Sequence, residues 1–144
     1  MSATRSRKSW REKLADAKDL PKTIVVPAPM EVDEVMRRVP KGKLATINEL
    51  RTCLARKHGT TVACQMTTGI FAWIAAHAAA EARAAGEKDI TPYWRTLKTG
   101  GELNPKYPGG IPALKKLLAA EGHKVVQKGK KHIVADFESK LAAL

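Results

Sequence analysis

The sequence predicts a mainly α-helical domain with small β elements, and three observations support this fold class. Apolar residues recur at helical spacing, as in the run Val32, Val35, Met36 and Val39. Proline, glycine and capping residues mark the ends of the periodic segments. The chain has 144 residues, 44% of them hydrophobic, which fits one domain with a real core.

The N-terminal region, residues 1–29, is expected to be a basic tail followed by an arm. A short helix is predicted from Trp10 to Leu20, where Pro21 stops it. Residues 23–26 fit either a strand or an arm packed on the core. The main domain should therefore begin after this region.

Two helices with clear end signals follow the arm. Residues 30–39 form the first, with acidic residues near its start, basic residues near its end and Pro40 as its stop. Residues 46–58 form the second, which begins with a capping box in which Thr46 is the N-cap and Glu49 follows three residues later. Both helices present one apolar face to a core.

A third helix is predicted to begin between residues 60 and 67 and to run to residue 85. Helix, short turn, helix is the order of a helix-turn-helix, in which this third helix would be the recognition helix. The remaining expected elements are small β elements at 90–103, a helix at 112–121 and a terminal hairpin at 123–134. With the hairpin as a wing, the predicted architecture is a winged helix-turn-helix.

The charge of the chain favours a polyanionic partner, of which nucleic acid is the commonest. The net charge is +12 and the pI is about 10.0. Residues 94–131 hold nine lysines and arginines but only two acids, Glu102 and Glu121, so the C-terminal third is the expected electrostatic footprint. We expect this part of the chain to face DNA.

Other sequence features restrict the class of protein. No apolar run approaches the ~20 residues that a membrane span needs, and the N-terminus lacks a secretory signal. The two cysteines, Cys53 and Cys64, imply no disulfide framework, and no cysteine–histidine spacing suggests zinc. We expect a cytoplasmic, nucleoid-associated protein that needs no membrane, metal or cofactor.

Four short motifs follow one another between residues 30 and 125. They are Val-Pro-Lys-Gly-Lys-Leu-Ala-Thr-Ile-Asn-Glu-Leu at 39–50, Thr-Pro-Tyr-Trp-Arg at 91–95, Tyr-Pro-Gly-Gly at 107–110 and Leu-Leu-Ala-Ala-Glu-Gly at 117–122. In this order they resemble four parts of the O6-alkylguanine-DNA alkyltransferases. These parts are the segment leading into the helix-turn-helix, the Pro-Cys-His-Arg active-site motif, the Tyr-Ser-Gly-Gly loop and the closing Leu-Leu-x-x-Glu-Gly.

The resemblance implies a division of the chain. Residues 30–125 would be the family's C-terminal DNA-binding domain. Residues 1–29 are too few for its usual N-terminal domain and remain a tail and arm. Residues 126–144 would form a hairpin and a short helix packed on the domain.

The departures from the family's pattern bear on catalysis. The family transfers an alkyl group to the motif cysteine, which is activated through the adjacent histidine that a glutamate orients. Here Tyr93 and Trp94 stand at the cysteine and histidine positions, and only Glu121 remains. A phenol with an ordinary pKa of about 10 is a poor nucleophile compared with a thiolate. The chain therefore resembles the alkyltransferase-like proteins, which lack the cysteine, and the implied role is to bind alkylated DNA without catalysis, flip out the lesion and mark it for repair.

The resemblance also implies the site residues. The expected lesion pocket combines aromatic surface for stacking, glycines that let backbone approach a ligand, and the retained glutamate: Tyr93, Trp94, Tyr107, Gly109, Gly110 and Glu121. The expected DNA contacts are basic and polar side chains of the helix-turn-helix and the following loops: Lys43, Thr46, Gln65, Met66, Thr67, Thr68, Arg95, Lys98 and Lys106.

Two further features of the family are missing. The tyrosine thought to rotate the nucleotide aligns with Ile47, and no arginine stands near the start of the recognition helix to fill the gap in the duplex. Gln65 or Met66 is the expected wedge instead, since apolar side chains can enter a base stack. This departure bears on nucleotide flipping more than on DNA binding.

Three other functions remain open at this point. The chain could be a general or regulatory DNA binder without lesion specificity, or an enzyme that uses Cys64 on the DNA-facing helix as alkyl acceptor. It could also be a protein-interaction module whose basic face is incidental. For the leading function the expected partners are double-stranded DNA, alkylated or not, and a repair-pathway protein, and the expected state is a monomer.

Overall fold

The computed structural model describes residues 9–16 and 23–144. The helices are α1 (Trp10–Asp16), α2 (Pro29–Arg37), α3 (Ile47–His58), α4 (Gln65–Ala84) and α5 (Gly110–Ala120). Short 3₁₀ turns are η2 (Tyr93–Arg95), η3 (Thr99–Gly101) and η4 (Phe137–Lys140). The predicted fold class, mainly α with small β elements, is confirmed. The end of the helix predicted at 10–20 lies outside the described residues.

The first two helices of the domain form where their end signals predict. The apolar face of α2 is buried, with Val32, Val35 and Met36 at most 2% exposed. The capping box of α3 forms as expected: the Thr46 hydroxyl accepts the N–H of Asn48 at 3.2 Å, and Glu49 accepts the N–H of Thr46 at 2.7 Å. Local sequence therefore fixes the orientation in which α3 enters the core.

The helix predicted as the recognition helix, α4, begins at Gln65, within the predicted window, and ends at Ala84. Its buried face consists of small residues: Thr68, Ala72, Ala75, Ala76 and Ala79. Small side chains let α4 lie close against α2 and α3. As a consequence four of its large apolar side chains are exposed, Met66, Ile70, Trp73 and Ile74, while Phe71 packs against the core.

Short strands tie distant segments together in pairs. β1 (Ile24–Val25) pairs in parallel with β3 (Val62–Ala63), so the segment predicted as a strand or arm is a strand. β2 (Ala45–Thr46) pairs in parallel with β4 (Thr96–Leu97), which places the 91–95 motif beside the start of α3. This second pair brings two of the family-like motifs into contact.

The C-terminal third differs in detail from the expectation. Much of 90–103 is 3₁₀ turn rather than strand, with only β4 and the bridges Lys98–Glu102 and Glu102–Ile133 in extended pairing. The helix predicted at 112–121 begins two residues earlier, at Gly110. Asp136 precedes a 3₁₀ turn rather than an α-helix.

The wing is an antiparallel hairpin of β5 (Val125–Lys128) and β6 (Lys131–Val134). Gly129, with φ of 62°, lies in its turn. The hairpin is attached to the segment that follows η3, because Leu103 donates its N–H to the carbonyl oxygen of His132 at 2.8 Å.

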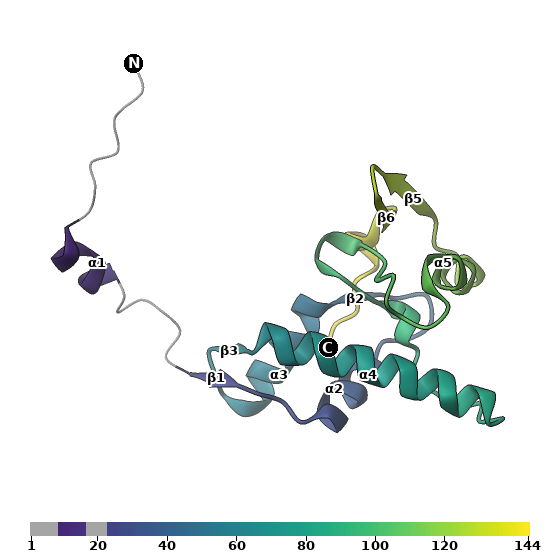
Figure 1. Ribbon diagram of the computed structural model, residues 1–144, viewed down its shortest axis with the longest axis horizontal. Helices are drawn as coiled ribbons and strands as arrows, with labels where there is room; N and C mark the ends of the chain where they lie inside the picture. Colours follow the sequence, from purple (N-terminus) through teal and green to yellow (C-terminus); the bar gives the residue numbers. More distant parts are fainter. Residues whose placement is uncertain (1–8, 17–22) are drawn as a thin grey trace, which may run out of the picture.

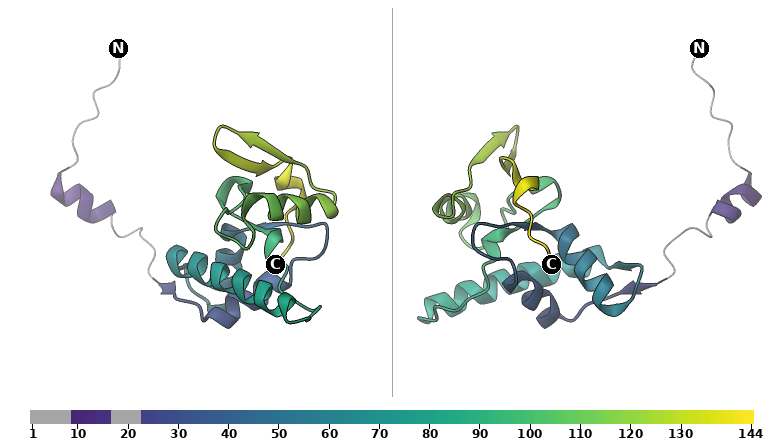
Figure 2. Two further views of the ribbon diagram at one scale, coloured as in Figure 1. Left: turned by 45° about the vertical axis from the view of Figure 1, so that its right-hand side comes forward. Right: turned by 180° about the vertical axis from the view of Figure 1, so that it is seen from behind.

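The elements form two halves around one core (Figures 1 and 2). α2, α3 and α4 pack together in one half, and α5 with the β5–β6 hairpin lies in the other. The C-terminal segment returns to the core, where Leu44 donates to the carbonyl oxygen of Lys140 at 2.9 Å and accepts from Ala142 at 2.8 Å. Within the described residues no helix combines the length and the apolarity required for a membrane span.

Candidate nucleic-acid interface

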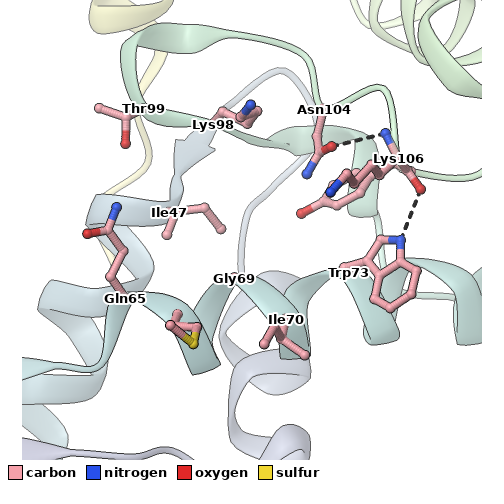
Figure 3. A pocket seen from close by; sticks show the side chains of 11 residues that line it. Ile47, Gln65, Gly69, Ile70, Trp73, Lys98, Thr99, Asn104 and Lys106 are labelled. Atoms are coloured by element: carbon pink, nitrogen blue, oxygen red, sulfur yellow. Dashed lines mark hydrogen bonds between the residues drawn. The ribbon is translucent and has the colours of Figure 1, made fainter.

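An open groove of about 480 Å³ lies along the N-terminal half of α4 (Figure 3). One wall of the groove comes from α4 itself: Gln65, Met66, Gly69, Ile70 and Trp73. Met66 is 73% exposed, and Ile70 and Trp73 are 44% and 43% exposed. The chain has no lysine or arginine between residues 65 and 82, so this wall is uncharged and largely apolar.

The opposite wall is polar and positively charged. It is formed by the segment between β4 and α5: Lys98, Thr99, Asn104, Lys106 and Tyr107. Both lysines are exposed, and Ile47, the first residue of α3, also lines the groove. The groove thus combines a flat apolar side with a cationic rim.

Two side chains of α4 hold the opposite wall in place. Trp73 donates its indole N–H to the carbonyl oxygen of Lys106 at 3.0 Å, and Nε2 of His77 lies 2.9 Å from the same oxygen. The Trp73 and His77 rings meet edge to face, with centroids 5.3 Å apart. The N–H of Lys106 is held as well, by Oδ1 of Asn104 at 3.0 Å. Both the N–H and the carbonyl oxygen of Lys106 are therefore held by hydrogen bonds, which fixes the backbone of this rim residue.

An aromatic cluster supports the groove from behind. Tyr107 lines the groove, although only 3% of it is exposed, and the ring of Tyr93 packs edge-on against Tyr107 and Trp94 at 6.3 and 5.3 Å between centroids. Burial raises the pKa of both Tyr93 and Tyr107 above the ordinary value. Both phenols therefore stay neutral near pH 7, and Tyr93 is not poised to act as a nucleophile.

The positions that resemble the family's catalytic histidine and glutamate form a closed network. Glu121 accepts hydrogen bonds from Trp94 Nε1 at 2.7 Å and from Arg95 Nε and Nη2 at 2.9 Å each. The backbone N–H of Gly42 also donates to it, and Arg95 Nη1 donates to the carbonyl oxygen of Val39 at 2.8 Å. Burial alone would raise the pKa of Glu121, but the bonds from Arg95, Trp94 and Gly42 outweigh it and hold the pKa low. Glu121 therefore links η2 to α5 as an ionised structural group.

Four residues predicted for the lesion pocket do not line the groove. Trp94 and Glu121 bond to each other, and Trp94 lines a separate hollow near the C-terminal end of α4. Gly109 and Gly110 have positive φ of 77° and 67° at the start of α5. A Cβ on Gly109 would collide with Ala113, so this glycine is required by the packing of the turn. These four residues lie outside the groove, and their part in a lesion pocket stays a prediction.

Three of the predicted DNA contacts are engaged inside the protein. Thr46 is 3% exposed and caps α3. Thr68 is fully buried and donates its hydroxyl to the carbonyl oxygen of Cys64 at 2.7 Å. Arg95 is held by Glu121 and Val39. Their polar groups are committed to hydrogen bonds within the fold, which disfavours the predicted contact of these side chains with DNA.

The remaining predicted contacts are distributed around the groove. Gln65, Met66, Lys98 and Lys106 line it, and Lys43 is exposed outside its lining. Thr67 is half-buried at the start of α4. For these residues, contact with DNA stays a prediction.

Sequence reasoning missed the outward face of α4 and the polar residues opposite it. The missed residues are Gly69, Ile70, Trp73, Thr99 and Asn104. A signal was present in α4, where alanines at 72, 75, 76 and 79 recur at helical spacing and can form the buried face. The large side chains between them must then point outward.

Cys64 lies at the N-cap of α4 and is half-buried. Hydrogen bonds from Thr67 lower its pKa, with smaller contributions from the N–H of Met66 and the charge of Arg51. It is not among the residues that line the groove.

No protein-family model and no curated protein matches the sequence. Among solved structures, the S. pombe protein Atl1 in complex with damaged DNA containing O6-carboxymethylguanine is similar, with a TM-score of 0.55 and 16% sequence identity. The match covers 81% of this chain and 94% of that chain. The chain shares the fold of Atl1. A structure of S. pombe ATL with DNA is also found, with a TM-score of 0.49, 17% identity and the same coverage.

Proposed function

We propose that the protein binds double-stranded DNA across the groove and accommodates an alkylated guanine base there without removing the alkyl group. The observation that carries the proposal is the pairing of an apolar wall on α4 with a cationic rim opposite it. The shared fold supports it, because the solved Atl1 structure contains DNA with an O6-alkylated guanine. Recognition followed by repair by another protein would then be the biological role.

The groove suits a base in size and in chemistry. Its volume of about 480 Å³ falls among small-molecule pockets, which hold roughly 300–1,000 Å³. Ile70 and Trp73 present apolar surface, and stacking on aromatic side chains contributes roughly 1–3 kcal/mol per base. An added alkyl carbon gains about 0.8 kcal/mol per buried CH₂, which favours the alkylated base over guanine. These gains offset the few kcal/mol needed to unstack a nucleotide.

Between residues 65 and 82, α4 carries no lysine or arginine. This excludes one mode of reading DNA with that part of the helix. Guanine is usually read in the major groove by arginine or lysine on its O6 and N7 atoms, and that stretch of α4 carries neither side chain. Met66 is 73% exposed near the start of α4, as a side chain that enters a base stack should be. Lys98 and Lys106 on the opposite rim would hold the phosphate backbone. Binding would therefore rest on apolar contact and charge rather than on base-edge hydrogen bonds from α4.

The proposal that no alkyl transfer occurs is supported by the residues at the positions that resemble the family's catalytic ones. Tyr93 is a buried neutral phenol, and Glu121 is occupied by Arg95 and Trp94. Neither can act as an activated nucleophile or as its base. The protein would leave the alkyl group on the base and release the DNA unchanged.

A fluorescence-anisotropy titration tests the proposal with matched duplexes that differ in one O6-methylguanine. We expect at least tenfold tighter binding of the alkylated duplex, about 1.4 kcal/mol. Equal and steeply salt-dependent binding would instead establish a general DNA binder, and absence of salt-dependent binding would favour a protein-interaction module.

The intact mass of the protein after incubation with the alkylated duplex tests the second half of the proposal. We expect no mass change. Gain of one methyl group, mapped to Cys64, would contradict the non-catalytic role and establish Cys64 as the acceptor.

A further inference from the structure

A second open cleft, of about 510 Å³, lies between the outer face of α3 and the segment that forms β3. Polar side chains dominate its lining: Asn48, Arg51, Thr52, Arg56, Thr60 and Thr61. No carboxylate is among the residues that line it. The cleft is therefore suited to an anion rather than to a cation or an apolar group.

Arg51 is fixed in the wall of this cleft with part of its guanidinium unused. Its Nε donates to the carbonyl oxygen of Ala63 at 3.0 Å, which sets the plane of the group. Among the described residues its two Nη nitrogens have no hydrogen-bond acceptor, and no carboxylate lies within ion-pair distance. Arg56 is less available, since its Nη2 donates to the carbonyl oxygen of Leu144 at 3.2 Å. Arg51 is thus the principal anion-binding group of the cleft.

The cleft and the groove lie back to back. Ile47 lines the groove and the next residue, Asn48, lines the cleft. On the other side of the same ridge Gln65 lines the groove and Ala63 lines the cleft. The starts of α3 and α4 therefore separate the two hollows. The DNA backbone continues on both sides of every base, so phosphates flank a base held in the groove, and the cleft is a neighbouring hollow suited to an anion.

We propose that the cleft binds a backbone phosphate of the DNA next to the base held in the groove, with Arg51 as its main ligand. The inference rests on the proposed function, since it takes the groove to be the DNA-facing side. A guanidinium presents paired N–H donors that match two phosphate oxygens, and the amide of Asn48, which also lines the cleft, adds a donor beside it. Phosphate contacts position a protein without reading the base. The cleft therefore sets affinity and register but not the preference for a lesion.

The variant Arg51→Gln removes the phosphate ligand. We expect it to bind plain and alkylated duplexes about tenfold more weakly, and the slope of log affinity against log salt to fall by about 1. The ratio between the two duplexes should stay unchanged. Arg83→Gln is the matched control, because it removes the same charge near the C-terminal end of α4. That end lies about 30 Å along the helix from the start of α4. Equal binding by Arg51→Gln and Arg83→Gln would overturn the inference.

Arg51→Gln also removes the hydrogen bond from Arg51 to Ala63. A second variant therefore tests the cleft with this bond intact. Thr52 is exposed, so Thr52→Glu places a carboxylate in the cleft without disturbing the core. We expect at least a tenfold loss of binding to either duplex, against less than twofold for Ala84→Glu on α4. If Thr52→Glu binds DNA as Ala84→Glu does, the cleft does not hold a phosphate.

A change in the DNA locates the contact. A single neutral methylphosphonate linkage beside the lesion should weaken binding of the wild-type protein about tenfold and have no effect on Arg51→Gln. A loss of equal size in both proteins at every flanking linkage would overturn the assignment. A different result would contradict the proposed function: equal binding of plain and alkylated duplexes by the wild-type protein. The comparison of wild type with Arg51→Gln would still show whether the cleft binds a phosphate.

Discussion

Single residues at the 91–95 motif form a structural network with the end of α5. Glu121, at the position that resembles the alkyltransferase glutamate, joins Trp94 and Arg95 in a network that is at most 14% exposed at the ion pair. A partly buried arginine needs its carboxylate partner more than a surface one does. Trp94, Arg95 and Glu121 therefore stabilise the fold.

Removal of the Glu121 carboxylate should destabilise the protein strongly. Glu121→Ala leaves Arg95 unpaired in a largely buried position, and we expect the free energy of unfolding to fall by about 3 kcal/mol. Glu138→Ala, at an exposed site, should change it by less than about 0.5 kcal/mol. Denaturant unfolding measures both. A cost below about 1 kcal/mol for Glu121→Ala would show that the network does not support the fold.

At the scale of elements, α4 determines the interface because its polarity is inverted. Alanines face the core and large apolar residues face solvent, so the helix offers contact area where a soluble helix usually offers charge. Trp73 and His77 on this face also hold the Lys106 carbonyl, which connects α4 to the opposite wall. The width of the groove is thus set by two side chains one helical turn apart.

Loss of this connection should affect lesion preference more than affinity. Replacing both donors, in Trp73→Phe with His77→Phe, keeps apolar rings but leaves the Lys106 carbonyl without its partners. We expect the preference for the alkylated duplex to fall about tenfold while plain-duplex affinity changes less than twofold. Ile74→Val, an exposed neighbour outside the groove lining, is the control and should change neither. An unaltered preference in the double variant would show that the connection does not set the groove.

For the whole molecule, the elements were more predictable than the site. The α3 capping box, the end of that helix at Gly59 and the hairpin turn at Gly129 depend on neighbours in the sequence, and they form as expected. Thr68 and Arg95 have side chains of DNA-binding type, but their burial depends on residues brought close only by folding. Composition indicated the kind of surface, and tertiary packing decided which residues lie on it.

Acid should weaken the whole fold through groups whose pKa is lowered in the folded protein, among them Glu121, Glu31 and His123. Hydrogen bonds from the Ala28 N–H, Lys57 and His58 lower the pKa of Glu31 from 4.5 to about 2. Burial and the charge of Lys140 lower the pKa of His123 below 6.5. These pKa values are lower in the folded state, so the unfolded chain binds more protons and stability falls as pH falls.

Urea unfolding across pH separates these contributions. We expect a first loss of stability as pH falls below 6.5, through His123, and a further loss as pH falls below 4.5, through Glu31, whose pKa is about 2, and through Glu121. Glu31→Gln should flatten only the lower range and His123→Leu only the upper. A wild-type stability that rises on acidification would contradict the direction of these pKa shifts.

The central claim, that a base enters the groove, is tested most directly by the lesion preference of Gly69→Leu. Gly69 lies in the groove wall, has ordinary helical φ and leaves its Cβ position open, so leucine fills the groove without strain. We expect Gly69→Leu to fold with at least wild-type stability and to bind plain duplex within twofold of wild type. Its tenfold preference for the alkylated duplex should disappear, while Ala78→Leu, outside this groove, retains it. A preference that survives in Gly69→Leu would place the lesion elsewhere on the protein and contradict the account.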